Sequence, residues 1–192
     1  MTRVVLPPLP RATTAPRTAP DAASRPTAPA RRAGRLTVAP TPREVARSLA
    51  GQRWEPLIEF REPRWYRRVA EGPGWEAWLL SWLPGQSTGL HDHGGSAGAF
   101  AVLRGAVDEV LPLPSRPDSD DAEAGRTRLA RRRYRAGQVR AFPAHHLHDV
   151  AAGGELAVTL HVYAPRLVSM TRYALVDGAL AVTSREREGQ DW

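Results

Sequence analysis

The stretch GQSTGLHDHGGSAGAFAVLRG, residues 85–105, places a His-Asp-His triplet within a run of glycines. In an extended strand, residues i and i+2 point to the same face, so His91 and His93 present two imidazoles side by side. Two neutral imidazoles at that spacing can bind one side of a transition-metal ion, and glycines help the backbone bend around it. A lone triplet of this kind is also typical of a half-solvated sheet face, so a metal site needs a further ligand.

A third histidine lies about fifty residues later, in GQVRAFPAHHLHDV, residues 137–150. His148 follows a Gly-to-Pro turn pattern and precedes the apolar run of another strand. The spacings within residues 85–105 and within residues 137–148 resemble the two motifs of the cupin superfamily. The usual first motif carries a glutamate where this chain has Gly98.

A three-histidine site without that glutamate, followed by the strand LAVTLHVYAP at residues 156–165, resembles the thiol dioxygenases, specifically type I cysteine dioxygenase. The resemblance covers about residues 60–175. It implies an all-β cupin jelly-roll sandwich whose cofactor is Fe(2+), bound by the three histidines His91, His93 and His148. Three neutral ligands leave the ion its full positive charge and open positions for a thiolate and O2.

The strand LAVTLHVYAP also carries an expected catalytic row. Thr159, His161 and Tyr163 alternate onto one face, and because the opposite face is equally apolar, the strand is expected to be buried on both sides. Buried hydroxyl and imidazole groups need partners. The row resembles the Ser-His-Tyr row of the family, in which the tyrosine hydroxyl reaches bound substrate or oxygen.

The substrate carboxylate is expected to meet an arginine. In the family an arginine on an early strand binds it, and in the stretch RWYRRVA, residues 64–70, Arg67 matches best and Arg68 is the alternative. Relatives that oxidise 3-mercaptopropionate carry their arginine about nine residues after the tyrosine, where this chain has Arg172. Pro165, two residues after Tyr163, favours the cysteine type, in which a cis X-Pro bond shapes the pocket.

Two neighbouring groups receive supporting interpretations. His145 and His146 are interpreted as loop residues or as supports of the ligands, and Asp149 is expected to orient a nearby group. Mammalian members have a cysteine where Gly98 stands, cross-linked to the active-site tyrosine. This chain has no cysteine, so it resembles the bacterial form.

Composition limits the remaining possibilities. The chain has 192 residues, enough for one domain, and no apolar run of the ~20 residues that cross a bilayer. Of its net charge of +7, residues 1–40 hold seven arginines and one acid, which leaves about +1 for the rest. We therefore expect a cytoplasmic protein, monomeric, whose partners are a small thiol and O2 rather than nucleic acid or a membrane.

The chain divides into three segments. Residues 1–40, rich in Ala, Pro and Arg, are predicted to be a disordered tail, because they cannot bury enough apolar surface to offset chain entropy. Residues 41–184 are the predicted cupin domain, with short helices at residues 41–51 and 54–60 followed by about ten strands. An acidic loop is predicted at residues 114–125, and residues 185–192 are predicted to be a short polar C-terminal tail.

Three functions compete at this level. The leading hypothesis is a dioxygenase that converts L-cysteine to cysteine sulfinic acid. The alternatives are a dioxygenase of 3-mercaptopropionate or another small thiol, and a metal-binding cupin without enzymatic activity.

Overall fold

The computed structural model describes residues 39–113 and 126–188. Nearly all of the predicted tail, the predicted acidic loop and the last four residues lie outside these ranges. The described chain begins with helix α1 (Pro42–Ala50) and the short 3-10 turn η1 (Glu55–Leu57), and the strands that follow are β1 (Tyr66–Gly72), β2 (Trp75–Trp82), β3 (Leu90–His91), β4 (Ala97–Arg104), β5 (Ala106–Leu113), β6 (Arg128–Arg135), β7 (Val139–Phe142), β8 (Asp149–Ala152), β9 (Ala157–Ala164), β10 (Ser169–Val176) and β11 (Ala179–Arg187).

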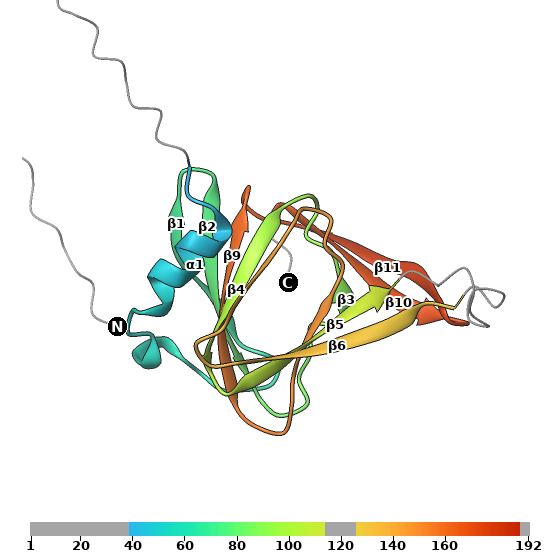
Figure 1. Cartoon of the computed structure of the whole chain (residues 1–192), viewed down its shortest axis with the longest axis horizontal. Coiled ribbons are helices and arrows are strands. Elements are labelled where there is room, and N and C mark those ends of the chain that lie inside the picture. The colour runs from blue at the N-terminus through green and yellow to red at the C-terminus, as the bar shows by residue number, and fades with distance from the viewer. Residues whose placement is uncertain (1–38, 114–125, 189–192) are drawn as a thin grey trace, which may run out of the picture. The chain divides into compact units, whose positions relative to one another are not determined.

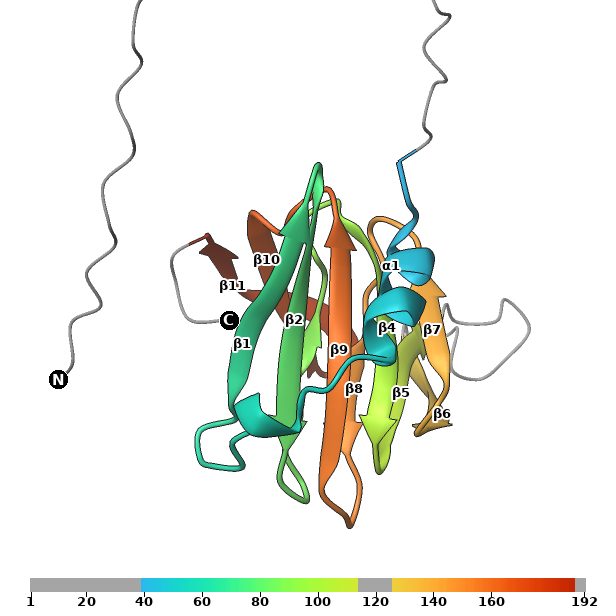
Figure 2. The ribbon, with the colours of Figure 1, turned by 90° about the vertical axis from the view of Figure 1, so that its left-hand side faces the viewer.

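Helix α1 forms where the sequence supplies both of its ends. The Thr41 hydroxyl accepts a hydrogen bond from the Glu44 backbone N–H, while the Glu44 carboxylate accepts one from the Thr41 backbone N–H. Pro42 occupies the first helical turn, where its missing N–H costs nothing, and Gly51 caps the other end. The buried face of the helix carries Leu49 and its neighbours and lies against β4, with β9 and β7 on either side (Figure 2).

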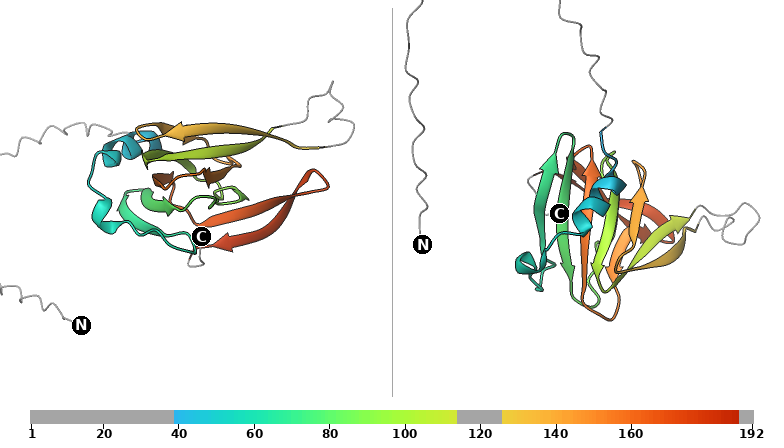
Figure 3. Two further views of the ribbon diagram at one scale, coloured as in Figure 1. Left: turned by 90° about the horizontal axis from the view of Figure 1, so that it is seen from below. Right: turned by 60° about the vertical axis from the view of Figure 1, so that its left-hand side comes forward.

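The strands form two layers. One layer is a five-stranded sheet in the order β1-β2-β9-β4-β7, with α1 on its outer face (Figure 1). The other layer consists of two three-stranded sheets, β11-β10-β3 and β6-β5-β8. Isolated bridges from His91 to His148 and from Ser87 to Ala151 join these two sheets at the seam between β3 and β8. Seen from below, the β5–β6 and β10–β11 hairpins extend to the same side as separate ribbons (Figure 3).

Each face of the five-stranded sheet has its own apolar cluster. The cluster between the layers includes Trp82, Phe100 and Phe142, and the cluster beneath α1 includes Leu79 and Leu160. The central strand β9 therefore has apolar partners on both faces and is buried along seven of its eight residues. Successive side chains on β9 point alternately into the cluster between the layers and into the cluster beneath α1. A row of polar side chains on this strand is therefore buried, which is unusual because buried polar groups need hydrogen-bond partners.

The architecture agrees with the predicted all-β jelly roll with short N-terminal helices. One boundary needs correction. Strand β11 continues to Arg187, and Ser169 pairs with Arg187 in the β10–β11 ladder, so the domain does not end at residue 184 as predicted. Within the described residues, no helix is long and apolar enough to cross a membrane.

Candidate metal centre

Three buried histidines meet at the seam between the two smaller sheets. The ring centroids of His91, His93 and His148 lie 4.8 to 5.0 Å from one another, and one ligand atom from each lies within 4.8 Å of the others. His91 is 3% exposed, and His93 and His148 are fully buried. Three imidazoles converging in this way match the donor set that binds a transition-metal ion in proteins.

Backbone pairing sets the positions of these histidines. The His91 backbone N–H donates to the His148 carbonyl over 2.9 Å, and the His148 N–H returns the bond over 3.0 Å. His91 also stands opposite Arg172 in the β3–β10 ladder. Between the ligands, Asp92 points away and accepts hydrogen bonds from the Tyr173 hydroxyl over 2.7 Å and the Gly94 N–H over 2.9 Å, which fixes the turn after β3.

The unused ring nitrogens fit a metal ion. The Nδ1 of His91 donates to the Gly89 carbonyl over 2.9 Å, which leaves Nε2 as its ligand atom. Among the described residues, Nε2 of His148 and both ring nitrogens of His93 are buried without a hydrogen-bond partner. Burial, together with the neighbouring imidazoles, lowers the pKa of His91 and His93 well below the ordinary value. Neutral imidazoles with buried, unpaired nitrogens are the state that a metal requires.

A buried carboxylate orients one of the ligands. Glu109 of β5 is fully buried, and its Oε1 accepts from Nδ1 of His148 over 3.0 Å and from Nε2 of His146 over 2.9 Å. Its Oε2 accepts from Arg140 over 3.0 Å and from the Tyr134 hydroxyl over 3.3 Å. Burial alone would raise the pKa of Glu109, but the hydrogen bonds from both histidines and Arg140 outweigh it and hold that pKa well below its ordinary value. The ionised carboxylate keeps the proton of His148 on Nδ1 and turns Nε2 toward the other ligands.

The expected row on β9 is connected by hydrogen bonds. The Thr159 hydroxyl lies 2.9 Å from Nε2 of His161, the Tyr163 hydroxyl lies 3.4 Å from Nδ1, and Trp82 donates to Thr159 over 2.9 Å. Burial lowers the pKa of His161 to about 3, with smaller effects from the charges of His148 and Arg64. Burial also raises the pKa of Tyr163. At neutral pH, His161 is therefore uncharged and Tyr163 keeps its phenolic proton.

A pocket lies beside the histidines and is mostly apolar. Its apolar wall comes from Trp78, Leu80, Leu167 and Met170, and its polar groups come from Arg64, Thr88, His91, His161, Tyr163 and Arg172. Tyr163 also approaches the ligands, because its ring lies 5.0 Å from that of His93. The structure thus brings a predicted ligand, two residues of the predicted row and Arg172 to one cavity.

Arg64 is a pocket residue that the sequence reasoning missed. Its Nη1 donates to the Ser87 carbonyl over 2.8 Å, and its guanidinium lies 4.9 Å from the centre of the Trp82 ring. Its Nε, like Nε1 of Trp78, is buried without a hydrogen-bond partner in the described part of the chain. Burial lowers the pKa of Arg64, and the charge of Arg172 adds to that shift. A guanidinium with a buried, unpaired N–H is a natural site for an anionic group.

Arg67, the predicted substrate arginine, is not in the pocket. It is exposed and stands opposite Leu79, whose side chain lies in the cluster beneath α1, so Arg67 points to the outer face of the sheet. Arg68, the alternative, faces the other way but pairs with Glu76 over 3.5 Å and with Glu71 over 3.7 Å, and it does not line the pocket. Arg67 points away from this pocket because one step along a strand reverses the direction of a side chain. Arg64 lies two residues before Tyr66, and both side chains line the same cavity. In the sequence, this two-residue spacing was the feature that could have indicated Arg64.

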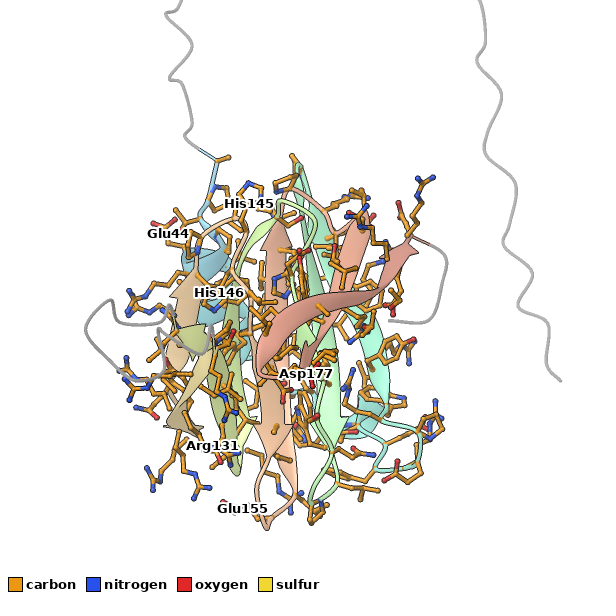
Figure 4. The ribbon with its side chains drawn as sticks, turned by 90° about the vertical axis from the view of Figure 1, so that its right-hand side faces the viewer. Glu44, Arg131, His145, His146, Glu155 and Asp177 are labelled. Carbon is orange, nitrogen blue, oxygen red and sulfur yellow. The ribbon has the colours of Figure 1, made fainter. Side chains whose placement is uncertain are left out.

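The other predicted residues have identifiable places. Figure 4 labels His145, which is exposed, and His146, which contacts Glu109 and thereby supports His148. Asp149 accepts a hydrogen bond from the Thr88 hydroxyl over 3.0 Å, so it orients a pocket residue. The Ala164–Pro165 bond is cis. At Gly98, a Cβ atom would lie 2.5 Å from the Phe142 ring, so that ring occupies the space in which a carboxylate ligand would stand.

Comparisons with known proteins identify the family. The family cysteine dioxygenase type I matches residues 47–175, and no curated protein matches the chain. Similar solved structures include an uncharacterized conserved protein with a double-stranded β-helix domain from Klebsiella pneumoniae, at 13% identity over 69% of this chain and 96% of that one, with a TM-score of 0.46. A cupin superfamily protein from Desulfitobacterium hafniense has 19% identity over 57% of this chain and 84% of that one, with a TM-score of 0.42.

Oxalate oxidase is similar over a smaller part. It has 19% identity and a TM-score of 0.38, and the match covers 48% of this chain and 42% of the oxalate oxidase chain. The chain therefore spans well under half the length of that protein. The family match, by contrast, extends over more than half of this sequence and includes His91, His93, His148 and the whole of the β9 row. On that evidence the chain belongs to the cysteine dioxygenase type I family.

Proposed function

We propose that this protein is an Fe(II)-dependent dioxygenase that oxidises L-cysteine to cysteine sulfinic acid. The reaction adds both oxygen atoms of O2 to the thiol sulfur, so one thiol and one O2 give one sulfinic acid and no external reductant is needed. Bound iron supplies the redox chemistry that O2 requires to react with a thiolate. The observation that carries the proposal is a cluster of three neutral histidines, one of which, His91, lines the same pocket as a guanidinium with a buried, unpaired Nε.

The three histidines favour an anionic sulfur. None of the ligands carries a charge, so the positive charge of the ion remains available to attract a thiolate. Phe142 contributes to this, because its ring fills the space beside Gly98 and keeps a carboxylate ligand out. The ring also stacks on His93, at 5.0 Å between centroids, and so holds that ligand in place.

Arg64 is proposed to bind the substrate carboxylate. Its Nε and the Nε1 of Trp78 are unpaired donors in the described structure, and both residues line the same apolar cavity. A charge-assisted hydrogen bond in such a closed site is worth about 2 to 3 kcal/mol. Losing it would reduce kcat/KM by roughly 30- to 150-fold.

Tyr163 is proposed to contact the reacting groups as a neutral hydrogen-bond donor. Its raised pKa keeps the phenol protonated, and the neutral His161 beside it is held by Thr159, which in turn is held by Trp82. The row on β9 therefore supplies one oriented hydroxyl to the pocket without adding a charge. Removing the hydroxyl would leave the metal ligands intact, because none of the three histidines is hydrogen-bonded to it in the described structure.

The first test is thiol-dependent O2 consumption by protein reconstituted anaerobically with Fe(II), with L-cysteine, 3-mercaptopropionate and cysteamine as substrates. We expect uptake with L-cysteine and one sulfinate formed per O2. Arg64→Gln is expected to lower kcat/KM for L-cysteine by roughly 30- to 150-fold. Arg67→Gln is the matched control, because it removes the same charge three residues away on the outer face of the sheet, and it should leave the kinetics unchanged.

A second candidate substrate is 3-mercaptopropionate, which Arg172 favours because it lines the same pocket. If 3-mercaptopropionate is the better substrate and Arg172→Gln is the damaging change, the assignment to cysteine is wrong. If the protein binds Fe(II) but consumes no O2 with any thiol, it is a metal-binding module and the proposed activity fails.

A further inference from the structure

Two guanidinium groups line the substrate pocket, and their surroundings differ. Arg64 and Arg172 both line the cavity beside the histidines and also a second pocket that shares Thr88 and Tyr66 with it. Two free cations at this place would favour a doubly anionic ligand or a ligand without an ammonium group. The contacts of each arginine decide how much of its charge a substrate meets.

Arg172 is occupied by a residue of the last strand. Its Nε lies 3.0 and 3.2 Å from the two carboxylate oxygens of Glu186, and its Nη2 lies 3.1 Å from one of them. Its Nη1 donates to the Thr88 carbonyl over 2.7 Å. All three nitrogens of the guanidinium are therefore engaged, in a two-pronged pair that is among the stronger geometries for such contacts.

The pair is sheltered enough to be effective. The side chains of Arg172 and Glu186 are 19% and 22% exposed, so neither charge is fully screened by water. Glu186 lies on β11 opposite Met170, which is a pocket residue, and Ser184 hydrogen-bonds the same carboxylate over 3.5 Å. The Glu186 carboxylate is thus held in a fixed position by the β10–β11 hairpin.

Arg64 has no comparable partner in the part of the chain that the structure describes. Its guanidinium donates to the neutral carbonyl of Ser87, and its Nε is buried without a partner among the described residues. Its charge is therefore directed at the pocket, whereas the charge of Arg172 is paired with that of Glu186. A ligand in the cavity therefore meets one unpaired guanidinium, that of Arg64, and one that is already ion-paired, that of Arg172.

We propose that Glu186 determines substrate specificity by neutralising Arg172 and holding it in place, so that the pocket offers a single free guanidinium to a thiol with one carboxylate and an ammonium group. This inference rests on the proposed thiol dioxygenase function. The ammonium of L-cysteine tolerates a pocket with one free cation better than a pocket with two. Removing the charge of Glu186 releases Arg172 and favours a thiol that is purely anionic.

Three thiols of different charge test this inference. Besides its thiol, 3-mercaptopropionate carries one negative charge, L-cysteine carries one of each sign, and cysteamine carries one positive charge. Their dissociation constants are measured calorimetrically on protein loaded with Zn(II), which binds thiolates without turnover. The kcat/KM of the Fe(II)-loaded protein is measured in parallel for the same three thiols.

Glu186→Gln is expected to tighten binding of 3-mercaptopropionate about tenfold, to change binding of L-cysteine by less than about threefold, and to weaken binding of cysteamine. Glu188→Gln is the matched control, because Glu188 is exposed and lies two residues further along, and it should change none of the three constants. An unchanged ratio between 3-mercaptopropionate and L-cysteine in Glu186→Gln would overturn the inference.

A double variant guards against a folding defect. Replacing both Arg172 and Glu186 by glutamine removes a pair of opposite charges, so its net charge equals that of the wild type, and the wild-type preference among the thiols should return. If the double variant binds 3-mercaptopropionate as tightly as Glu186→Gln does, Arg172 is not the source of the tighter binding and the inference fails. If the double variant loses binding of L-cysteine, Arg172 contacts the ligand directly and the inference fails as well. Absence of O2 uptake by the wild type would count against the dioxygenase function alone, because the Zn(II) binding data still decide the role of Glu186.

Discussion

At the scale of single residues, the buried carboxylate of Glu109 orients His148 in the candidate metal centre by binding the ring nitrogen that faces away from the other ligands. It holds Nδ1 of His148, and it is itself held by His146, Arg140 and Tyr134. Partners of this kind fix the tautomer and the ring orientation of a metal ligand, and losing them typically costs 10- to 100-fold in metal affinity. No local sequence rule assigns such a role to an acid in an apolar strand.

Glu109→Gln should therefore lower the affinity for Fe(II) or Zn(II) by roughly 10- to 100-fold, because the amide can no longer act as an anionic acceptor for His148. A competition titration against a chromophoric chelator measures this directly. Asp108→Asn is the control, since Asp108 is the adjacent acid and contacts Arg131 and Arg133 instead of a histidine. Equal losses of affinity in both variants would show that net charge, and not orientation of His148, is responsible.

At the scale of elements, the pairing of β4 with β7 excludes a carboxylate from the metal site. Gly98 stands opposite Phe142, and a Cβ at Gly98 would lie 2.5 Å from the Phe142 ring and 3.0 Å from the Val162 carbonyl. Because the ring is also stacked on His93 and His146, it cannot move without disturbing both histidines. The glycine is thus required by packing.

Gly98→Ala should destabilise the fold by about 1 to 3 kcal/mol, the usual cost of overpacking a core, and should weaken metal binding as the Phe142 ring shifts. Urea unfolding measures the first effect and metal titration the second. Gly51→Ala is a suitable control, because Gly51 has a negative φ and its Cβ would meet nothing within 4 Å. A fully stable Gly98→Ala variant would contradict the packing argument.

The ladder between β5 and β6 carries a pH-dependent ion pair. Asp108 accepts from Arg133 over 2.8 and 3.0 Å, and these hydrogen bonds hold the pKa of Asp108 below its ordinary value of 3.8, against the opposing effect of burial. A lowered pKa in the folded state means that the stabilisation is present above pH 3.8 and disappears as the pH falls through the folded-state value.

Asp108→Asn should therefore have a lower melting temperature than the wild type at pH 7, and the difference should shrink as the pH falls below 3.8, where the wild-type carboxyl becomes protonated. Thermal unfolding of both proteins across this pH range provides the measurement. A difference that stays constant, or grows in acid, would show that charge on Asp108 is not the source of the stabilisation.

At the scale of the described domain, the candidate metal centre spans a seam. His91 belongs to the sheet β11-β10-β3, and His148 directly precedes β8 of the sheet β6-β5-β8, so an ion bound to both would connect the two small sheets. Backbone hydrogen bonds between residues 85–91 and 148–153 already join this seam, and an ion bound to both histidines would add a further link. A metal should therefore contribute to the stability of the fold as well as to the chemistry.

Removal of metal by a chelator should lower the melting temperature, and adding Zn(II) or anaerobic Fe(II) should raise it in a concentration-dependent manner. At a free metal concentration of 100 times the dissociation constant, the expected gain is about 2.7 kcal/mol. Differential scanning calorimetry at several metal concentrations measures it, with His148→Ala as the variant that should not respond. A response of that variant equal to the wild type would place the stabilising ion elsewhere.

The sequence by itself determined the features that depend on local spacing. The interval between His91 and His93, the position of His148 before a strand, and the alternation of Thr159, His161 and Tyr163 all follow from the two-residue period of a strand. The ends of α1 follow equally from Thr41 and Gly51. Each of these is a relation between residues close together in the chain, and the metal-ligand triad needed only one further motif at a distance.

Only the tertiary structure decided which arginines line the pocket and which of them are ion-paired. Arg64 lines the pocket because the segment before β1 packs beside it, where Arg64 donates to the Ser87 carbonyl 23 positions along the chain, while Arg67 points to the outer face of the sheet. The contact of Glu186 with Arg172 depends on how far β11 extends along β10, and that of Glu109 with His148 joins residues 39 positions apart. Such contacts depend on the three-dimensional arrangement of sheets, which the period of a single strand does not encode.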